Sequence, residues 1–121
     1  ANVTLTGGVA LQTQESWCEF ISKDLQSISF GGNAAELYFE EDKFDDFLKK
    51  LAAIKGIFYV HPVQQYSWGQ RVIRFYDPDF HILEVGENMK SVCRRFLDSG
   101  MTIEAAVRMN VPEKFVRACV R

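Results

Sequence analysis

Residues 68–85 of the chain read WGQRVIRFYDPDFHILEV and contain two strand patterns on either side of a turn. Residues 70–76 and 81–85 are rich in β-branched and aromatic side chains, which favour strands. Residues 77–79 are Asp-Pro-Asp, which is typical of a tight turn because proline presets its own φ angle. The stretch therefore predicts two neighbouring strands joined by a short turn.

Alternation along the second strand places Glu84 on one face and Leu83 and Val85 on the other. A carboxylate that faces inward is costly unless it is paired or bound to a cation. Glu84 is therefore a candidate functional residue. The competing interpretation is a solvated or salt-bridged glutamate with no chemical role.

The residues before this stretch complete a β-α-β-β-β order. Residues 36–40 alternate as a strand, and residues 58–63 predict another. Residues 45–54 between them place their apolar side chains on one helical face, with acidic residues near the start and lysines near the end. We therefore expect an α+β fold with a mixed sheet.

The N-terminal residues predict a hairpin. Residues 3–6 and 9–13 are short strand patterns, and Gly7 and Gly8 between them suit the positive φ angles of a two-residue turn. A Gly-Gly-Asn break at residues 31–33 predicts a boundary after this part. The hairpin is similar to the closing strands of an earlier copy of the same module, and we expect residues before Ala1 to complete that copy.

The C-terminal part predicts helices. Residues 89–97 are amphipathic, residues 103–109 predict a second helix, and Pro112 begins a third. The last two helices resemble a helix-turn-helix unit. Ala106 falls at the position of its small residue, Asn110 at its turn, and Val111 and Val116 at its two buried apolar positions. Residues 88–121 carry 7 basic and 3 acidic side chains, against 7 basic and 13 acidic in residues 1–87. We favour a tail that packs on the acidic part or on a partner subunit over one that binds nucleic acid.

Composition limits the remaining classes. The chain has 121 residues, of which 47% are hydrophobic and 25% charged, as in ordinary globular domains. No apolar run approaches the roughly 18 residues of a membrane span, and residues 1–4 do not resemble a signal peptide. Three cysteines with no zinc-binding spacing predict a reduced, cytoplasmic setting.

Residues 68–85 also resemble a family signature: a WG-x-R strand, a DPDG turn and a strand with two apolar residues before glutamate. With residues 35–42 as the first strand, the pattern is similar to that of the glyoxalase/bleomycin-resistance/dioxygenase (vicinal oxygen chelate) superfamily. Phe80 stands where the signature has glycine. The resemblance implies a glyoxalase-like domain over residues 1–87, with an incomplete first module and a second module at about 35–87, followed by the tail. It also implies sheets curled around a cavity and a homodimer.

The resemblance implies a metal site as well. In metal-dependent members such as glyoxalase I, the first and fourth strands of each module supply ligands. The matching positions here are Gln12, Glu36 and Glu84, and the fourth would lie before Ala1. This oxygen-rich set would suit one divalent ion such as zinc, nickel, manganese or iron. Glu84 or Glu36 could then move the proton in a lyase or isomerase reaction on a small vicinal-oxygen substrate.

Two alternatives stay open beside this enzyme. One is a metal-free module that binds or sequesters a small molecule, as in the bleomycin-resistance branch, with aromatic walls from Tyr38, Phe58, Tyr66 and Trp68. The other is a ligand-responsive regulator that acts through the helical tail. The departures at Gln12 and Glu36 favour the metal-free module. His61 and His81 have no acid or nucleophile at a motif spacing, so we expect them to be structural or exposed.

Overall fold

The structure is a computed structural model that describes residues 2–100, 102, 103 and 113–118. The chain divides into two compact units, residues 1–32 and 33–121. The division falls at the Gly-Gly-Asn break of residues 31–33. The boundary expected between residues 87 and 88 stays a prediction. None of the described helices is long and apolar enough to cross a bilayer.

The first unit begins with the expected hairpin. Strands β1 (Asn2–Thr4) and β2 (Ala10–Gln12) pair antiparallel, with Asn2 opposite Gln12. Gly7 and Gly8 between them have φ angles of 98° and 89°, which only glycine adopts readily. Helix α1 (Gln14–Ile21) follows, and a 3-10 turn, η1 (Leu25–Ser27), completes the unit.

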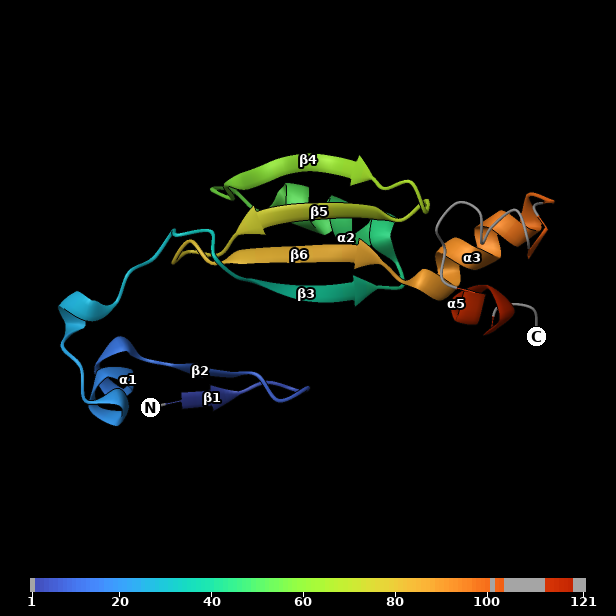
Figure 1. Ribbon diagram of the computed structural model, residues 1–121. Coiled ribbons are helices and arrows are strands. Elements are labelled where there is room, and N and C mark those ends of the chain that lie inside the picture. Colours follow the sequence, from blue (N-terminus) through green and yellow to red (C-terminus); the bar gives the residue numbers. More distant parts are fainter. Residues whose placement is uncertain (1, 101, 104–112, 119–121) are drawn as a thin grey trace. The chain divides into compact units, whose positions relative to one another are not determined.

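The second unit contains the predicted β-α-β-β-β module (Figure 1). Its elements are β3 (Glu36–Glu41), α2 (Phe44–Ala53), β4 (Tyr59–Gln65), β5 (Arg71–Tyr76) and β6 (Ile82–Glu87). The sheet order is β3-β6-β5-β4, in which β3 and β6 run parallel and the other pairs antiparallel. The α+β class and the mixed sheet are confirmed. These four strands form an open layer, without the curl that we expected.

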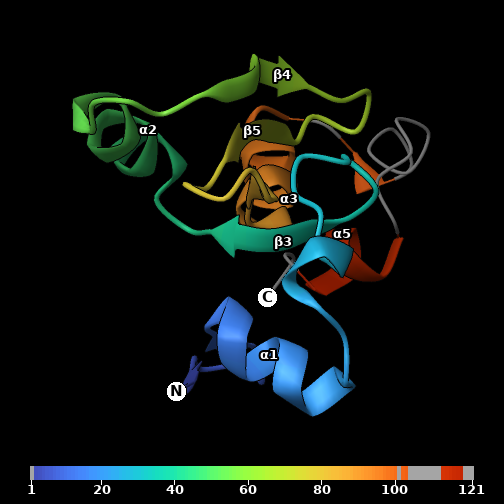
Figure 2. The same cartoon turned by 90° about the vertical axis from the view of Figure 1, so that its left-hand side faces the viewer.

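Helix α2 covers one face of this sheet (Figures 1 and 2). Alternation along the strands sends apolar side chains to that face, where they bury the apolar side of the helix. The buried residues of this core are Phe44, Leu51, Ile73, Phe75 and Val85. We call the opposite side of the sheet, which bears Glu36, Tyr38, Arg74 and Glu84, the polar face.

Helix α3 (Met89–Asp98) begins directly after β6, and the Asn88 side chain caps it by accepting from the backbone of Lys90 and Ser91. Its buried residues Met89, Val92 and Cys93 form a second core with Trp68 and Phe96. Helix α5 (Glu113–Ala118) matches the third expected helix. Residues 104–112 lie outside the described part of the chain, so the helix-turn-helix resemblance stays a prediction.

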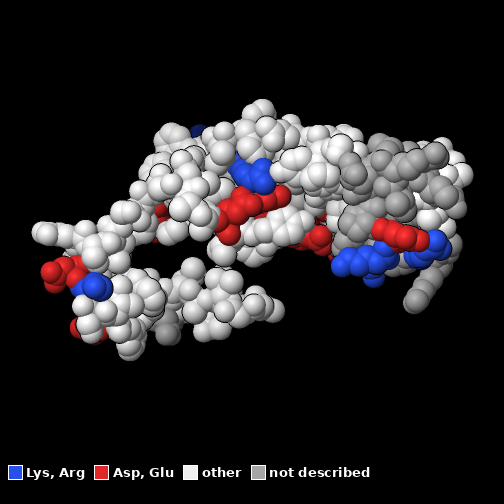
Figure 3. Space-filling view, viewed as in Figure 1, with Lys and Arg blue, Asp and Glu red and all other residues white. Residues whose placement is uncertain are grey.

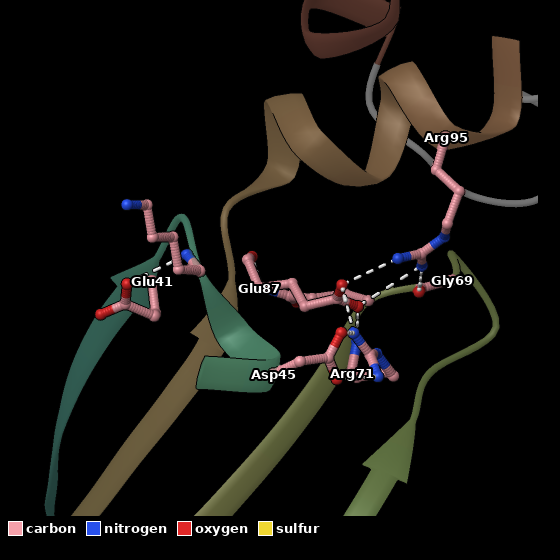
Figure 4. Close-up of polar contacts among 8 residues, drawn as sticks. Glu41, Asp45, Gly69, Arg71, Glu87 and Arg95 are labelled. Carbon is pink, nitrogen blue, oxygen red and sulfur yellow. Dashed lines mark hydrogen bonds and ion pairs between the residues drawn. The ribbon is translucent and has the colours of Figure 1, made fainter. Parts of the chain in front are cut away.

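A buried carboxylate ties α3 to the module. Glu87 is 5% exposed and accepts hydrogen bonds from the guanidinium groups of Arg71 and Arg95 (Figure 4). Arg71 also pairs with Asp45 at the start of α2, and Arg95 donates to the carbonyl of Gly69. We call Asp45, Arg71, Glu87 and Arg95 the Glu87 cluster. The cluster joins α2, β5, β6 and α3, so a structural role explains why these charges are buried together.

Phe80 fills the glycine position of the turn in the conformation that glycine would adopt. Its φ angle is 64°, in the left-handed region that costs an ordinary residue about 1–2 kcal/mol. Its ring packs with those of Phe58 and Tyr76, at centroid distances of 5.9 and 5.6 Å. The aromatic contacts offset the strain, so the turn is retained without its glycine.

Gly69 offers a direct test of how α3 fits the module. Its φ angle is 83°, and a Cβ atom added there would overlap the ring of Phe96. We expect Gly69→Ala to lower the free energy of unfolding by about 2–4 kcal/mol, because left-handed strain adds to overpacking. Gly56 has the same φ angle and nothing within 4 Å of its Cβ position, so Gly56→Ala should cost only about 1 kcal/mol. Urea unfolding of both variants measures the difference, and equal losses would contradict the packing of Phe96 on Gly69.

Candidate functional site

A charged group of residues lies in the middle of the polar face. Arg74 on β5 is opposite Glu84 on β6, and Glu84 is in turn opposite Tyr38 on β3. Glu36 begins β3, two residues before Tyr38, and so reaches the same face. Figure 3 shows a basic patch beside an acidic patch there, with uncharged atoms around both.

Arg74 joins side chains from three other strands. Its Nε donates to Oε2 of Glu36 at 2.8 Å, and its Nη2 donates to Oε1 of Glu84 at 2.7 Å. Its Nη1 lies 3.1 Å from Nε2 of His61 on β4. We call these four residues the Arg74 cluster. Each guanidinium nitrogen has a partner of its own, so the arginine is held in one orientation.

The hydrogen bonds also determine the tautomer of His61. Its Nδ1 lies 2.7 Å from the carbonyl oxygen of Pro62, which can only accept. The proton is therefore on Nδ1, and Nε2 presents its lone pair to Arg74. In this arrangement the imidazole contributes an acceptor to the cluster.

The two carboxyl groups have opposite pKa shifts. Glu84 is 7% exposed, and burial, reinforced by its contact with Glu36, raises its pKa to about 7. The hydrogen bond from Arg74, followed by that from Glu84, holds the pKa of Glu36 below its ordinary value. The hydrogen bond to Glu36 raises the pKa of Arg74, which therefore stays charged. Near neutral pH Glu84 is therefore partly protonated, whereas Glu36 is ionised.

The predicted aromatic residues are linked through a buried glutamine. Gln70 accepts from Nε1 of Trp68 at 3.0 Å and donates to the hydroxyl of Tyr38 at 2.9 Å. The rings of Tyr66 and Trp68 lie 4.4 Å apart, and Tyr66 is close enough to Arg74 to contribute to the raised pKa of the arginine. Phe58 is in a different place, stacked on Phe80. Three of the four aromatic residues therefore lie near the Arg74 cluster.

The structure brings Glu36 and Glu84 together as expected, although through a shared arginine. Gln12 belongs to the first unit, so its part in a common site stays a prediction. The sequence analysis missed Arg74 and Gln70 and assigned His61 no partner. One signal was available for Arg74, since it is a single cation between apolar residues in a strand beside Glu84.

The cluster does not fit a divalent ion in this arrangement. Each carboxylate has an oxygen on the Arg74 guanidinium, and Nε2 of His61 faces the same group. Across the described ranges of the chain, no three or more His, Cys, Asp or Glu side chains are grouped so as to hold a metal ion. The resident cation of the cluster is an arginine, which cannot accept a ligand electron pair.

Comparison with known proteins agrees with the fold. Residues 1–90 match the model of the glyoxalase-like domain family. A crystal structure of a protein of unknown function from Agrobacterium tumefaciens str. C58 is 36% identical, covers 72% of this chain and 68% of its own, and has a TM-score of 0.61. A member of the glyoxalase/bleomycin resistance protein/dioxygenase superfamily from Sphaerobacter thermophilus DSM 20745 is 27% identical over 43% of this chain and 41% of its own, with a TM-score of 0.38. A search of the curated proteins found no match.

The pKa of Glu84 predicts a dependence of stability on pH. Because this pKa is about 7 in the folded chain and 4.5 ordinarily, the folded state binds more protons between these values. The stabilisation is complete below pH 4.5 and is lost as the pH rises through about 7. Glu84→Gln stays neutral throughout. We expect the free energy of unfolding of the wild type, minus that of the variant, to fall by on the order of 2 kcal/mol across this window.

Urea unfolding of both proteins at intervals from pH 4 to 8 measures this difference. The pKa of Glu36 is lowered, so in the folded chain this residue titrates below the range from pH 4.5 to about 7. Its titration therefore does not contribute to the change in the measured difference. A difference that stays flat, or that rises with pH, would show that Glu84 is ionised in the folded chain at neutral pH.

Proposed function

The chain belongs to the family of glyoxalase-like domains, and from that premise we propose that it binds a small organic molecule on the polar face without a metal ion. The observation that carries the proposal is the pairing of both Glu36 and Glu84 with Arg74. In the metal-dependent proteins that this chain resembles, the matching positions hold the metal.

A metal ion would have to displace the arginine. Removing one partner of a buried ion pair costs about 3–5 kcal/mol, because the remaining charge is left uncompensated. Here the arginine has two carboxylates and an imidazole as partners, and Glu84 is nearly fully buried. The arrangement therefore favours the metal-free alternative over a metal-dependent lyase or isomerase.

The residues around the cluster indicate the kind of ligand. Tyr38, Tyr66 and Trp68 offer aromatic surface, and Gln70 holds Tyr38 and Trp68 in place. A protonated Glu84 adds a hydrogen-bond donor near neutral pH. This combination suits a small planar molecule that carries a carbonyl or other oxygen acceptor. Phe58 is left out of the proposed surface because it packs with Phe80.

Metal content is the first test. Protein purified without chelator or nickel affinity resin, then dialysed against zinc, nickel, manganese or iron(II), should hold well below one ion per chain by elemental analysis. One ion per chain that is lost in Glu84→Gln, but kept in the control Asp45→Asn, would contradict the proposal. That result would support the metal-dependent enzyme instead, since Asp45 is an exposed carboxylate outside the Arg74 cluster.

Ligand binding is the second test. The chain has two tryptophans, so Trp17→Phe leaves Trp68 as the only tryptophan reporter. We expect planar aromatic fragments with a carbonyl group to change Trp68 fluorescence, and Tyr66→Ala to weaken their binding about tenfold through loss of a stacked ring. Tyr59→Ala, which removes an exposed tyrosine of β4, is the matched control. No fragment binding, or equal affinity in both tyrosine variants, would count against the polar face as the site.

A further inference from the structure

Gln70 is a buried amide that is held in one orientation. It is 5% exposed, and its Oε1 accepts from Nε1 of Trp68 at 3.0 Å. Its Nε2 donates to the carbonyl of Glu87 at 3.0 Å and to the hydroxyl of Tyr38 at 2.9 Å. An indole nitrogen can only donate and a carbonyl can only accept, so the amide oxygen and nitrogen cannot exchange places. Tyr38 therefore accepts a hydrogen bond from Gln70.

The hydroxyl of Tyr38 is oriented in turn. Because its oxygen accepts from Gln70, its proton goes to another partner, and it donates to Oε1 of Glu40 at 3.2 Å. Burial raises the pKa of Tyr38, so the hydroxyl keeps this proton near neutral pH. Among the hydrogen bonds described for the second unit, none uses the second lone pair of this oxygen. The hydroxyl can thus accept one more hydrogen bond, but its proton is already engaged.

We infer that Gln70 is a specificity-determining residue of the polar face, which acts through Tyr38 to select a planar ligand with an N–H or O–H donor. The inference rests on the binding function proposed above and narrows its ligand class. That function requires an oxygen acceptor on the ligand, and the orientation of Tyr38 adds a donor. A ligand that placed an ether oxygen against Tyr38 would bring two acceptors together and form no hydrogen bond there.

The surroundings of Gln70 are built for this contact. Gly86 leaves the space that it needs, since a Cβ atom there would lie 2.7 Å from Nε2 of Gln70 and 3.3 Å from the hydroxyl oxygen of Tyr38. Trp68, the donor to Gln70, packs against the core of α3. Tyr38 itself is 48% exposed, so it remains open to a ligand. Gln70 is therefore anchored on the α3 side and passes its orientation to an accessible side chain.

Three fragments that differ in one substituent test the preference. All carry an aromatic ring and a carbonyl group: para-hydroxyacetophenone adds a donor, para-methoxyacetophenone adds an acceptor, and acetophenone adds neither. In Trp17→Phe protein, the nitrogen-15 resonance of the Trp68 indole reports binding, at a pH at which the phenol is un-ionised. We expect the hydroxy fragment to bind about tenfold more tightly than the other two, which corresponds to about 1.4 kcal/mol for one hydrogen bond.

The role of Gln70 is read from the ratio of affinities, because a purely structural defect would weaken all three fragments together. Gln70→Met removes the donor to Tyr38, so the hydroxyl can turn its proton to a ligand oxygen. The preference for the hydroxy over the methoxy fragment should then fall below about threefold. Tyr38→Phe should remove the preference as well. The matched control is Gln65→Met, an exposed glutamine of β4 opposite Arg71, which should keep the tenfold preference.

A second variant decides the question if Gln70→Met does not fold. Glu40 is exposed, and Glu40→Ala frees the proton of Tyr38 for a ligand. The methoxy fragment should then gain affinity, and the preference for the hydroxy fragment should fall. A preference that is unchanged in Glu40→Ala, or kept in folded Gln70→Met, would overturn the inference.

The inference and the proposed function fail separately. Equal affinity for the three fragments in the wild-type sequence at position 70 would contradict selection by Gln70 and leave metal-free binding on the polar face intact. Binding of none of the three fragments would contradict both.

Discussion

The polar face of the second unit depends on one interaction, the pairing of the Arg74 guanidinium with the carboxylates of Glu36 and Glu84. Glu84 lies on a central strand and is almost fully buried, so the sheet is compatible with it only if its charge is balanced or removed. Arg74 balances the charge of the pair, and burial together with the contact between the two carboxyl groups favours the protonated form of Glu84. The same guanidinium determines which nitrogen of His61 faces the cluster.

Strand β5 carries two arginines, Arg71 and Arg74. Because they are three residues apart, their side chains lie on opposite faces of the sheet. Arg71 faces α2 and, with Glu87 and Arg95, fastens α2 and α3 to the sheet. Arg74 lies on the polar face opposite Glu84, and its described partners Glu36, His61 and Glu84 all belong to strands. Helix α3 still affects that face indirectly, because Trp68 packs into the α3 core and hydrogen-bonds to Gln70. The structural and the candidate functional clusters thus share a strand and keep separate partners.

Much of this fold could be predicted from local sequence, because alternation, capping residues and glycine breaks act over a few residues. The β-α-β-β-β order of the elements along the chain, the position of the break at residues 31–33 and the placement of Glu84 on the strand face opposite Leu83 and Val85 all follow from such patterns. The partners of Glu84 could not be predicted in the same way. His61 meets Arg74 only because the pairing of β4 with β5 shifts register on both sides of this histidine, and register shifts leave no clear signal in one sequence. The expected curl of the sheet also failed, since it was inferred from the resemblance and not from local patterns.

The central claim is that one fixed guanidinium holds both carboxylates, and NMR of the arginine side chain tests it most directly. In uniformly nitrogen-15-labelled protein at neutral pH, we expect the Nε and Nη protons of Arg74 to exchange slowly with water and to give separate resonances. These signals should shift in Glu84→Gln and remain unchanged on addition of zinc to the wild type. Averaged, rapidly exchanging Arg74 signals, or signals displaced by stoichiometric zinc, would contradict the account.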